Sequence, residues 1–481
     1  MTTYFPTIGL EIHAELNTVT KMFCNSKNDP DAEPNTNICP VCMAHPGTLP
    51  TINFEAVKHV IKVGHAVGGT IADFTEFDRK NYFYPDIPKG YQISQYEHPL
   101  VSGGALHDVE LTRIHLEEDT AKSTHDQGDY SLVDFNRAGV PLMELVTEPV
   151  ITSGEQAAAF AKELQLLLRY LGAGEANMEK GQMRVEANIS VSADKDVFGT
   201  KVEVKNLNSF RSVEGAIACE IERHTKALES GGEEIIQETR GWDEQKQTTF
   251  SQRQKEGSAD YRYFPEPDLP KIWISRVPEF QPDKITKEMP ELPWERRERY
   301  ATSYDLDTQT SDIFVQSLPW AAYFEAVIKE IGEDPKQQKL AVNYITSDFI
   351  GLMKKDENVP YFAEVDPARF IDPIHFAKVI EMAAEQKLSS RGAKDLLATL
   401  YREGGDPEEI AEKEGLLQKS NEGDLAQIVS DVVVENPDEA ESYKQGNEKV
   451  LQFLVGQGMK KSKGSANPQV LKELFEKELA A

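Results

Sequence analysis

The sequence lacks any apolar run of the roughly 18 residues that a membrane-spanning helix requires. Its first residues carry neither the basic segment nor the apolar segment of a secretory signal peptide. Cysteine is scarce as well, with 4 residues in a chain of 481, which fits a reducing compartment. We therefore expect a cytoplasmic protein with no membrane segment.

Positive charge is also in short supply. The chain has 52 Lys and Arg residues against 81 Asp and Glu residues, for a formal net charge of -29. A protein this acidic does not attract nucleic-acid phosphates through its overall field. Any contact with RNA must come from a local basic patch, from shape or from a partner subunit.

Several common catalytic motifs are absent. The chain has neither a G-x-x-x-x-G-K-[ST] phosphate loop nor a G-x-G-x-x-G turn after a strand, so any use of ATP needs a different cradle. It has no G-x-S-x-G nucleophile elbow and no amidase-type Ser/Lys set. We expect that the chain alone does not hydrolyse glutamine.

What is present divides into three regions. Alternating and helical apolar spacings are mixed up to about residue 290, with helices expected at residues 54–67, 154–171 and 212–229. The chain then reads as helical to its end, with helices expected at residues 320–331, 335–352 and 373–385. We predict an α+β fold with a mostly antiparallel sheet and flanking helices, followed by two all-helical domains. The predicted domains are residues 1–293, 294–405 and 406–481.

The strand predicted over residues 8–16 has two different faces. Successive side chains of a strand point to opposite sides, so Glu11, His13 and Glu15 share one face and apolar residues the other. Two carboxylates and an imidazole suit a divalent cation or proton transfer, although a solvated strand face is the commoner alternative. Similar polar faces recur in the segments at residues 111–117, 141–148, 185–192 and 201–207.

Glu144 is the least ordinary of these polar residues, because its neighbours are Pro, Leu, Met and Val. A carboxylate in such surroundings is paired or bound to a cation. Oxygen ligands with few imidazoles favour Mg²⁺. The antiparallel sheet built from these strands is therefore expected to carry a metal or acid–base site on its polar face.

Two further segments suggest binding sites. Residues 78–95 are dense in tyrosine, lysine, amides and proline, which is typical of a loop that contacts substrate, with tight packing as the alternative. Residues 261–268, punctuated by proline, are also expected to form a loop. Cys39 and Cys42 form half of a zinc knuckle with Cys24 upstream, but Ser26 stands where a fourth cysteine would complete it. Two interpretations are open. The cysteines could bind zinc with His45 or water as fourth ligand, or they could be a site that has lost its metal.

Long motifs along the whole chain resemble one family. They lie at residues 8–13 (IGLEIH), 33–37 with 39–42, 78–86 (DRKNYFYPD), 115–119 (HLEED), 130–137, 205–209, 256–268 and 453–460. The sequence is similar to the B subunits of tRNA-dependent amidotransferases, the GatB family. The resemblance implies a catalytic cradle domain that holds the acceptor end of tRNA, and a helical tail domain that binds the tRNA body.

The resemblance also implies an activity and partners. Such enzymes are ATP-dependent carbon–nitrogen ligases (EC 6.3.5 type) that use ATP and Mg²⁺. They phosphorylate the side-chain carboxylate of misacylated Glu-tRNA(Gln) or Asp-tRNA(Asn) and amidate it with ammonia. An amidase A subunit supplies the ammonia from glutamine through a channel, and a small C subunit completes the heterotrimer.

The resemblance assigns roles to particular residues. The catalytic and Mg²⁺-binding set is Glu11, His13, Glu118 and Glu144, and the channel or substrate set is Lys80, Tyr82, Lys89 and Glu186. A zinc site would use Cys24, Cys39 and Cys42, with Ser26 in place of one of the family's four cysteines. The basic turn Lys460, Lys461 and Lys463 is predicted to bind tRNA phosphates.

Two other functions are compatible with parts of the sequence. A stand-alone carboxylate–amine ligase acting on a small molecule would need no helical tail. A non-catalytic tRNA-binding subunit would leave Glu11, His13, Glu118 and Glu144 without a role.

Overall fold

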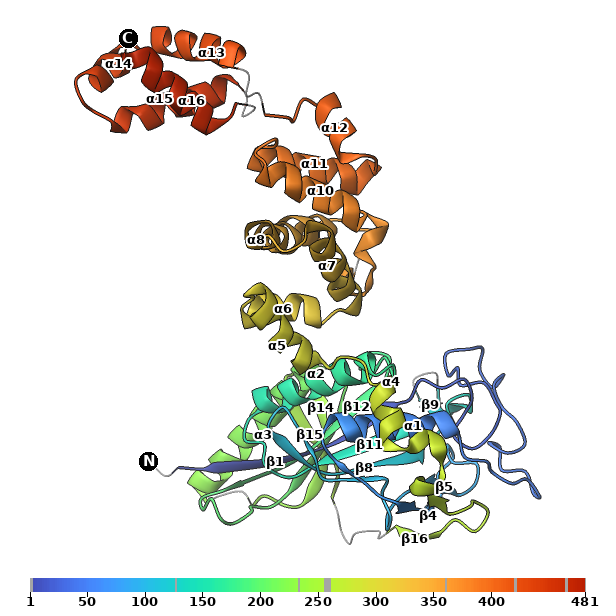
Figure 1. Cartoon of the computed structure of the whole chain (residues 1–481). Helices are drawn as coiled ribbons and strands as arrows, with labels where there is room; N and C mark the ends of the chain where they lie inside the picture. Colours follow the sequence, from blue (N-terminus) through green and yellow to red (C-terminus); the bar gives the residue numbers. More distant parts are fainter. Residues whose placement is uncertain are drawn as a thin grey trace. The chain divides into compact units, whose positions relative to one another are not determined.

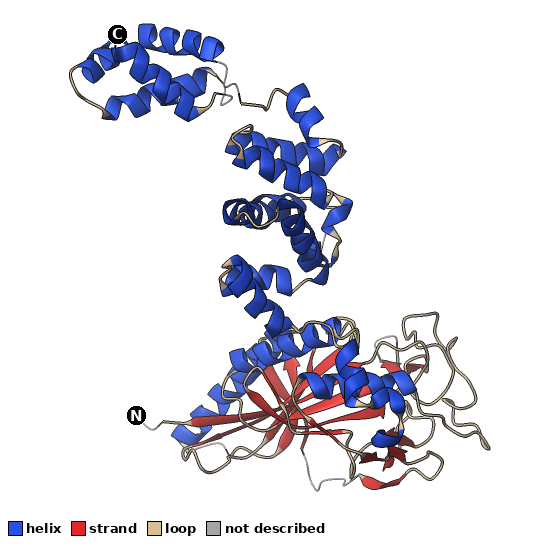
Figure 2. Cartoon of the chain, in the orientation of Figure 1, coloured by secondary structure: helices blue, strands red, loops and turns tan. Residues whose placement is uncertain are grey.

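The computed structural model describes residues 3–125, 128–231, 234–254, 261–359, 361–418, 422–462 and 466–480. It forms two compact units, Met1–Leu292 and Pro293–Ala481. Within the described residues, the strands lie in the first unit and the second unit is helical, so the predicted α+β class is confirmed (Figures 1 and 2). The division into three domains stays a prediction. No helix in the described part of the chain has the length and apolar content needed to cross a membrane.

The first unit is built on a ten-stranded sheet. Its strand order is β15 (Thr248–Gln254), β14 (Glu238–Asp243), β13 (Val202–Leu207), β12 (Met183–Ser192), β1 (Phe5–Glu15), β11 (Pro141–Thr147), β8 (Val109–Glu118), β6 (Val101–Ser102) and β2 (Thr70–Ile71), with β7 (Ala105–Leu106) paired to β8. Neighbouring strands are antiparallel except β13 and β14, which are parallel. The expected mostly antiparallel sheet is thus confirmed.

Three helices cover this sheet, as Figure 1 shows. They are α1 (Phe54–Ala66), α2 (Gly154–Tyr170) and α3 (Phe210–Ser230), and they match the helices predicted from sequence within a few residues. Each begins after a residue whose side chain accepts backbone N–H bonds, namely Asn53, Ser153 and Ser209. The apolar face of β1 is buried, from Ile8 to Ala14, which leaves the polar face of the strand on the opposite side.

A second, three-stranded sheet of β16 (Arg262–Pro265), β4 (Asp78–Asn81) and β5 (Tyr91–Ser94) corrects two predictions. Residues 78–95 and 261–268 were both expected to be loops. The backbone of β4 pairs with β5 on one side and with β16 on the other. The pairing of β16 with β4 joins segments far apart in the chain and leaves no local pattern. Strands β4 and β5 form a local hairpin, and Pro85 and Pro88 lie in its connection.

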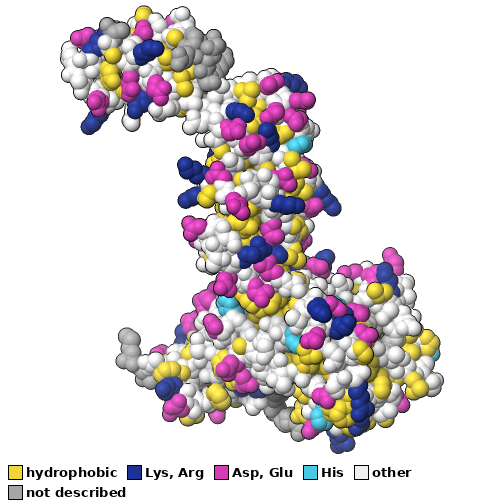
Figure 3. All heavy atoms as spheres, viewed as in Figure 1, with side chains coloured by type: hydrophobic (Ala, Val, Ile, Leu, Met, Phe, Trp, Pro, Cys, Tyr) yellow, Lys and Arg dark blue, Asp and Glu magenta, His cyan; other side chains and the backbone are white. Residues whose placement is uncertain are grey.

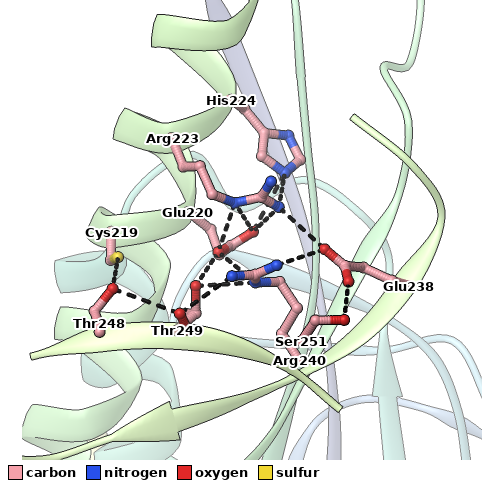
Figure 4. A network of polar contacts seen from close by, with 9 residues as sticks. All are labelled: Cys219, Glu220, Arg223, His224, Glu238, Arg240, Thr248, Thr249 and Ser251. Atoms are coloured by element: carbon pink, nitrogen blue, oxygen red, sulfur yellow. Dashed lines mark hydrogen bonds and ion pairs between the residues drawn. The ribbon is translucent and has the colours of Figure 1, made fainter. Parts of the chain in front are cut away.

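A buried polar network ties α3 to β14 and β15 (Figure 4). Glu220 of α3 is fully buried, with Arg223 and His224 as ion-pair partners on the same helix. Arg240 of β14 pairs with Glu220 and also with Glu238. The network therefore holds two strands at the sheet edge against the helix.

The second unit consists of helices of mostly moderate length. They are α5 (Pro293–Tyr304), α6 (Thr308–Val315), α7 (Leu318–Ile331), α8 (Pro335–Asn343), α9 (Ile350–Met353), α10 (Pro373–Ala384), α11 (Ser390–Glu403), α12 (Pro407–Lys413), α13 (Glu422–Glu435), α14 (Pro437–Lys444), α15 (Lys449–Lys461) and α16 (Pro468–Ala480). The single helix expected at residues 335–352 is interrupted by a π-helical turn, Tyr344–Phe349. The last four helices share a buried core that includes Leu425, Val429, Leu454, Leu471 and Phe475.

Candidate active site

Three neighbouring strands bring a row of ionisable side chains together. In the strand registers, His13 of β1 lies opposite Glu144 of β11, and Glu144 lies opposite His115 of β8. Directly paired residues project from the same face of a sheet. Glu11 and Glu117 lie two positions along their strands from His13 and His115, and so on the same face. The polar faces predicted from the separate strands therefore merge into one site.

The distances are short enough for a common ligand. His13 Nε2 lies 3.4 Å from Glu144 Oε2, 3.6 Å from Glu117 Oε1 and 3.8 Å from Glu11 Oε1. His115 Nε2 lies 3.3 Å from Glu144 Oε2. The ligand atoms form two overlapping groups, each within 4.8 Å, namely Glu11, His13 and Glu144, and His115, Glu117 and Glu144. We call these five residues the carboxylate–imidazole cluster.

The cluster is largely withdrawn from solvent, which perturbs its protonation. Burial, reinforced by the charges of Glu144 and Glu186, raises the pKa of Glu11. Burial disfavours the charged form of His13, but Glu144, Glu117 and Glu11 outweigh it and raise its pKa to about 9. Burial also disfavours ionisation of Glu144, yet His115 and His13 hold its pKa well below the ordinary value. The two imidazoles thus keep Glu144 ionised at neutral pH.

Two buried atoms of the cluster have no hydrogen-bond partner among the described residues. They are Oε2 of Glu117 and Nδ1 of His115, in side chains that are 2% and 3% exposed. An unsatisfied buried carboxylate oxygen is costly unless a cation or ligand occupies the adjacent space. Three carboxylates and two imidazoles offer mainly hard donors, which suit Mg²⁺.

Glu118, which we expected in this site, lies outside the cluster. It is on the opposite face of β8, where Lys89 Nζ donates to Oε2 at 2.7 Å and the Ile93 amide donates to Oε1 at 2.9 Å. Glu117 is the residue of this pair that groups with His115 and Glu144, and the role of Glu118 stays a prediction. The sequence held the signal, because Glu117 shares strand parity with His115 and Glu118 does not.

Two of the four predicted channel residues border the cluster. Lys80 Nζ lies 4.0 Å from Glu117 Oε2, and the register of β1 and β12 places Glu186 opposite Glu11. Burial opposes the charge on Lys80, but Glu117 and Tyr263 hold its pKa above the ordinary range. Glu186 accepts a hydrogen bond from Lys205 Nζ at 2.6 Å.

Of the other two channel residues, Lys89 lies on the far side of β8, whereas the ring of Tyr82 contacts Tyr261, which lies beside Lys80. Lys89 bonds Glu118, and the Tyr82 hydroxyl donates to Gln92 Oε1 at 3.3 Å. A cavity of about 210 Å³ reaches this region, and its lining includes Lys89, Glu118, Cys24, Cys42 and His45. Of the predicted set, Lys89 therefore lies with Glu118 and apart from the cluster.

The three N-terminal cysteines do lie together. The sulfur atoms of Cys24, Cys39 and Cys42 are within 4.8 Å of one another. Ser26 Oγ lies 3.8 Å from Cys42 Sγ, where a fourth ligand is missing, and the group does not include His45. The fully buried Lys21 places its ammonium 3.8 Å from the same sulfur. Three of the four ligands of a zinc site are therefore assembled. The Lys21 ammonium beside them already offsets thiolate charge, and zinc binding stays a prediction.

The predicted tRNA-binding turn is only partly described. Lys460 and Lys461 are the last residues of α15, and Lys463 lies outside the described residues. Lys461 Nζ pairs with Asp431 at 3.3 Å and with Glu435 at 2.6 Å, both on α13. Lys460 is exposed.

Comparison with known proteins assigns the family. Residues 6–277 match the GatB/GatE catalytic domain and residues 322–479 match the GatB domain. The B subunit of the aspartyl/glutamyl-tRNA(Asn/Gln) amidotransferase of Picosynechococcus sp. is 42% identical, over 99% of this chain and 98% of its own length. The protein of the same name from Thermodesulfovibrio yellowstonii is 43% identical, over 98% of each chain. With both domains matched and full-length relatives above 40% identity, the chain belongs to the GatB family.

Proposed function

We propose that this chain is the subunit of a glutamine-dependent amidotransferase that uses ATP to amidate misacylated tRNA. Its full-length relatives are named as B subunits of aspartyl/glutamyl-tRNA(Asn/Gln) amidotransferases. The observation that carries the proposal for this chain is the carboxylate–imidazole cluster. The substrates are Glu-tRNA(Gln), Asp-tRNA(Asn) or both, and the products are Gln-tRNA(Gln) and Asn-tRNA(Asn).

The chemistry requires two steps. A carboxylate resists attack by ammonia because its oxygen is a poor leaving group. In the first step a side-chain carboxylate oxygen of the aminoacyl group attacks the γ-phosphorus of ATP, and ADP leaves. In the second step ammonia attacks the acyl carbon, phosphate leaves with the C–O bond electrons, and the nitrogen loses a proton. The amide and inorganic phosphate are the products.

The cluster is assigned the metal-binding role in the first step. Glu11, His13 and Glu144 would hold one Mg²⁺, with Glu117 and His115 on the other side of Glu144. Bound Mg²⁺ would offset negative charge on the transferred phosphoryl group. Oε2 of Glu117 has no hydrogen-bond partner among the described residues, which supports this assignment, and Lys80 at 4.0 Å adds a positive charge at the same place.

Ammonia delivery is assigned to the acid and base side chains around the cluster. Ammonium must lose a proton before its nitrogen can attack, and carboxylates along a path can accept that proton. The Lys205–Glu186 and Lys89–Glu118 pairs are candidates, since each places an acid and a base in contact. The cavity beside Glu118 supports an approach from that face of β8.

The partners follow from the division of labour. The chain has no amidase motif of its own, so an amidase A subunit supplies ammonia and a small C subunit completes a heterotrimer. Amidation of aminoacyl-tRNA serves protein synthesis, which places the complex in the cytoplasm.

Reconstitution with the A and C partners tests the proposal. The complex is incubated with glutamine, Mg²⁺ and either Glu-tRNA(Gln) or Asp-tRNA(Asn), with and without ATP. We expect amidated aminoacyl-tRNA only when ATP is present, and ammonium salts should replace glutamine. Amidation of free glutamate or aspartate without tRNA would favour the stand-alone ligase. Failure to amidate either aminoacyl-tRNA would contradict the proposal.

A basic turn in the C-terminal tail is proposed to contact the tRNA body. Reversing Lys460, Lys461 and Lys463 to Glu should weaken tRNA binding and lower the slope of log Kd against log salt by roughly 0.9 per lost phosphate contact. Filter binding at several salt concentrations measures both quantities. The control reverses Lys472 and Lys477 on α16, and an equal loss in the two variants would show that binding is not located at the turn.

A further inference from the structure

An aromatic surface lies on and beside the three-stranded sheet of β16, β4 and β5. The rings of Tyr96 and Tyr263 are stacked, with centroids 4.2 Å apart and planes 14° apart. Tyr82 and Tyr261 meet edge to face at 5.4 Å. We call these four residues the tyrosine cluster. In Figure 3 hydrophobic and basic side chains adjoin one another at the lower right of the first unit, where β4 and β16 lie in Figure 1.

The tyrosine cluster is open to solvent yet held in place. Tyr96 is 56% exposed and Tyr261 is 51% exposed. The backbone N–H groups of Tyr96 and Glu97 donate to Asp78, a buried carboxylate of β4. Exposed aromatic rings on a fixed backbone are the usual construction of a surface on which nucleobases stack.

This surface borders the carboxylate–imidazole cluster. Lys80 Nζ lies 5.1 Å from the centroid of the Tyr261 ring and 4.0 Å from Glu117 Oε2. The register of β16 and β4 pairs Tyr263 with Lys80. One lysine side chain therefore separates the rings from the proposed site of phosphorylation.

Lys80 is the cation that contacts the tyrosine cluster, whereas Arg79 and Lys89 lie over Tyr91 and are already engaged. Arg79 donates two hydrogen bonds to Glu266, both at 2.8 Å, and Lys89 bonds Glu118 at 2.7 Å. A nucleoside triphosphate bound on this surface would need cations for its phosphates. A base at the end of a nucleic-acid strand needs only ring faces here, because its backbone phosphates can bind elsewhere. A base at the end of a strand therefore fits this surface, which offers ring faces with Lys80 beside them.

We infer that the stacked pair Tyr96–Tyr263 is the platform for the terminal adenine of the aminoacyl-tRNA. The inference rests on the proposed function and adds a binding site to it. The amino acid to be phosphorylated is esterified to the terminal ribose, so a short covalent tether joins its carboxylate to that adenine. With the carboxylate at the cluster, the base must lie close by. Tyr96 stacks on Tyr263, which pairs with Lys80, and Lys80 lies 4.0 Å from Glu117. Because stacking on an aromatic ring is sequence-tolerant, the same platform serves both tRNA substrates.

Steady-state kinetics of the complete heterotrimer tests this inference. Replacing Tyr96 by Ala should raise KM for aminoacyl-tRNA about 10-fold to 100-fold, the range expected for the loss of one stacked base. KM for ATP and glutaminase activity should stay at wild-type values, and Tyr96→Phe should restore KM because it keeps the ring. Tyr130→Ala is the matched control, since Tyr130 is equally exposed at 56%. An unchanged KM for aminoacyl-tRNA overturns the inference, as does a rise in KM for ATP alone, which would assign the platform to the adenine of ATP.

A binding measurement separates this inference from the proposed function. Uncharged tRNA with 2-aminopurine at the terminal position reports stacking through quenching of its fluorescence. We expect quenching by the wild-type complex, loss of quenching with Tyr96→Ala and Tyr263→Ala, and full quenching with Tyr130→Ala. This readout requires no amidation, so an inactive complex that still quenches would contradict only the proposed function. Equal signals from the wild type and Tyr96→Ala would contradict the platform even in an active complex.

Discussion

Replacing Glu144 by Gln is expected to reduce phosphorylation of the tRNA-bound carboxylate by about 10³-fold or more, a loss typical of removing a main electrostatic element of an active site. Glu144 belongs to both overlapping ligand groups and lies within 3.5 Å of His13, His115 and Arg113. The substitution keeps the shape of the side chain but removes the negative charge of Glu144. That charge would attract the bound cation and the two imidazoles. Glutaminase activity of the assembled complex should persist, since the proposed A subunit would carry it.

The measurement is tRNA-dependent formation of ADP over a range of Mg²⁺ concentrations. Glu148→Gln is the matched control, because Glu148 follows the same strand but lies outside both ligand groups and accepts from Thr112 Oγ1 at 2.7 Å. Thermal denaturation of both variants checks that the sheet is intact. A folded Glu144→Gln complex that forms ADP at the wild-type rate would show that the cluster is not the site of phosphoryl transfer.

The second large effect is on stability. Replacing Glu220 by Ala should cost about 3–5 kcal/mol, because removal of one partner of a buried ion pair leaves uncompensated charge behind. Arg240 Nε lies 3.3 Å from Glu220 Oε1, and Arg223 and His224 also pair with this carboxylate, as Figure 4 shows. We expect the edge strands β14 and β15 to open first, since they are joined to α3 through this network.

Thermal melts and hydrogen exchange of the chain measure this loss. Glu222→Ala on the same helix is the control, because Glu222 is exposed and pairs only with Lys226 among the contacts described. An exposed pair of this kind contributes about 0–1 kcal/mol. If both variants melt alike, the buried network contributes no more than a surface pair.

The same network predicts an acid dependence. Burial opposes ionisation of Glu220, but hydrogen bonds from His224, Arg223 and Thr249 lower its pKa to about 2. Since the folded pKa lies below the ordinary value, this contribution is complete above that value and is lost as the pH falls toward 2. Melting temperature should therefore fall less steeply with acid in Glu220→Gln than in the wild type. Parallel pH profiles would contradict this role of Glu220.

Local periodicity in the sequence predicted much of the fold. The alternation of residues 8–16 placed Glu11 and His13 on one face of a strand, and the structure confirms that face. Helical apolar spacing predicted α2 to within a residue of its end. Such features depend on neighbours only a few positions away, so they can be predicted without knowing the partners of an element.

The adjacent residues Glu117 and Glu118 show the limit of this reasoning. We assigned Glu118 to the cluster from the family resemblance, although strand parity favours Glu117. The structure places the two carboxylates on opposite faces of β8, one beside His13 and the other beside Lys89. A shift of one residue on a strand reverses the face of every side chain, so a motif match alone does not decide between adjacent glutamates.

The sequence by itself determined the α+β class, the helices that cover the sheet, the polar faces of its strands and the family. Only the tertiary structure decided that Glu144 lies between His13 and His115, that Lys80 connects Glu117 to the tyrosine cluster, and that two predicted loops pair as strands. The physical reason is the range of each interaction. Side-chain direction repeats every two residues in a strand and every 3.6 in a helix, so it depends on neighbouring residues only. Strand pairing joins segments far apart in the chain and depends on the packing of the whole sheet.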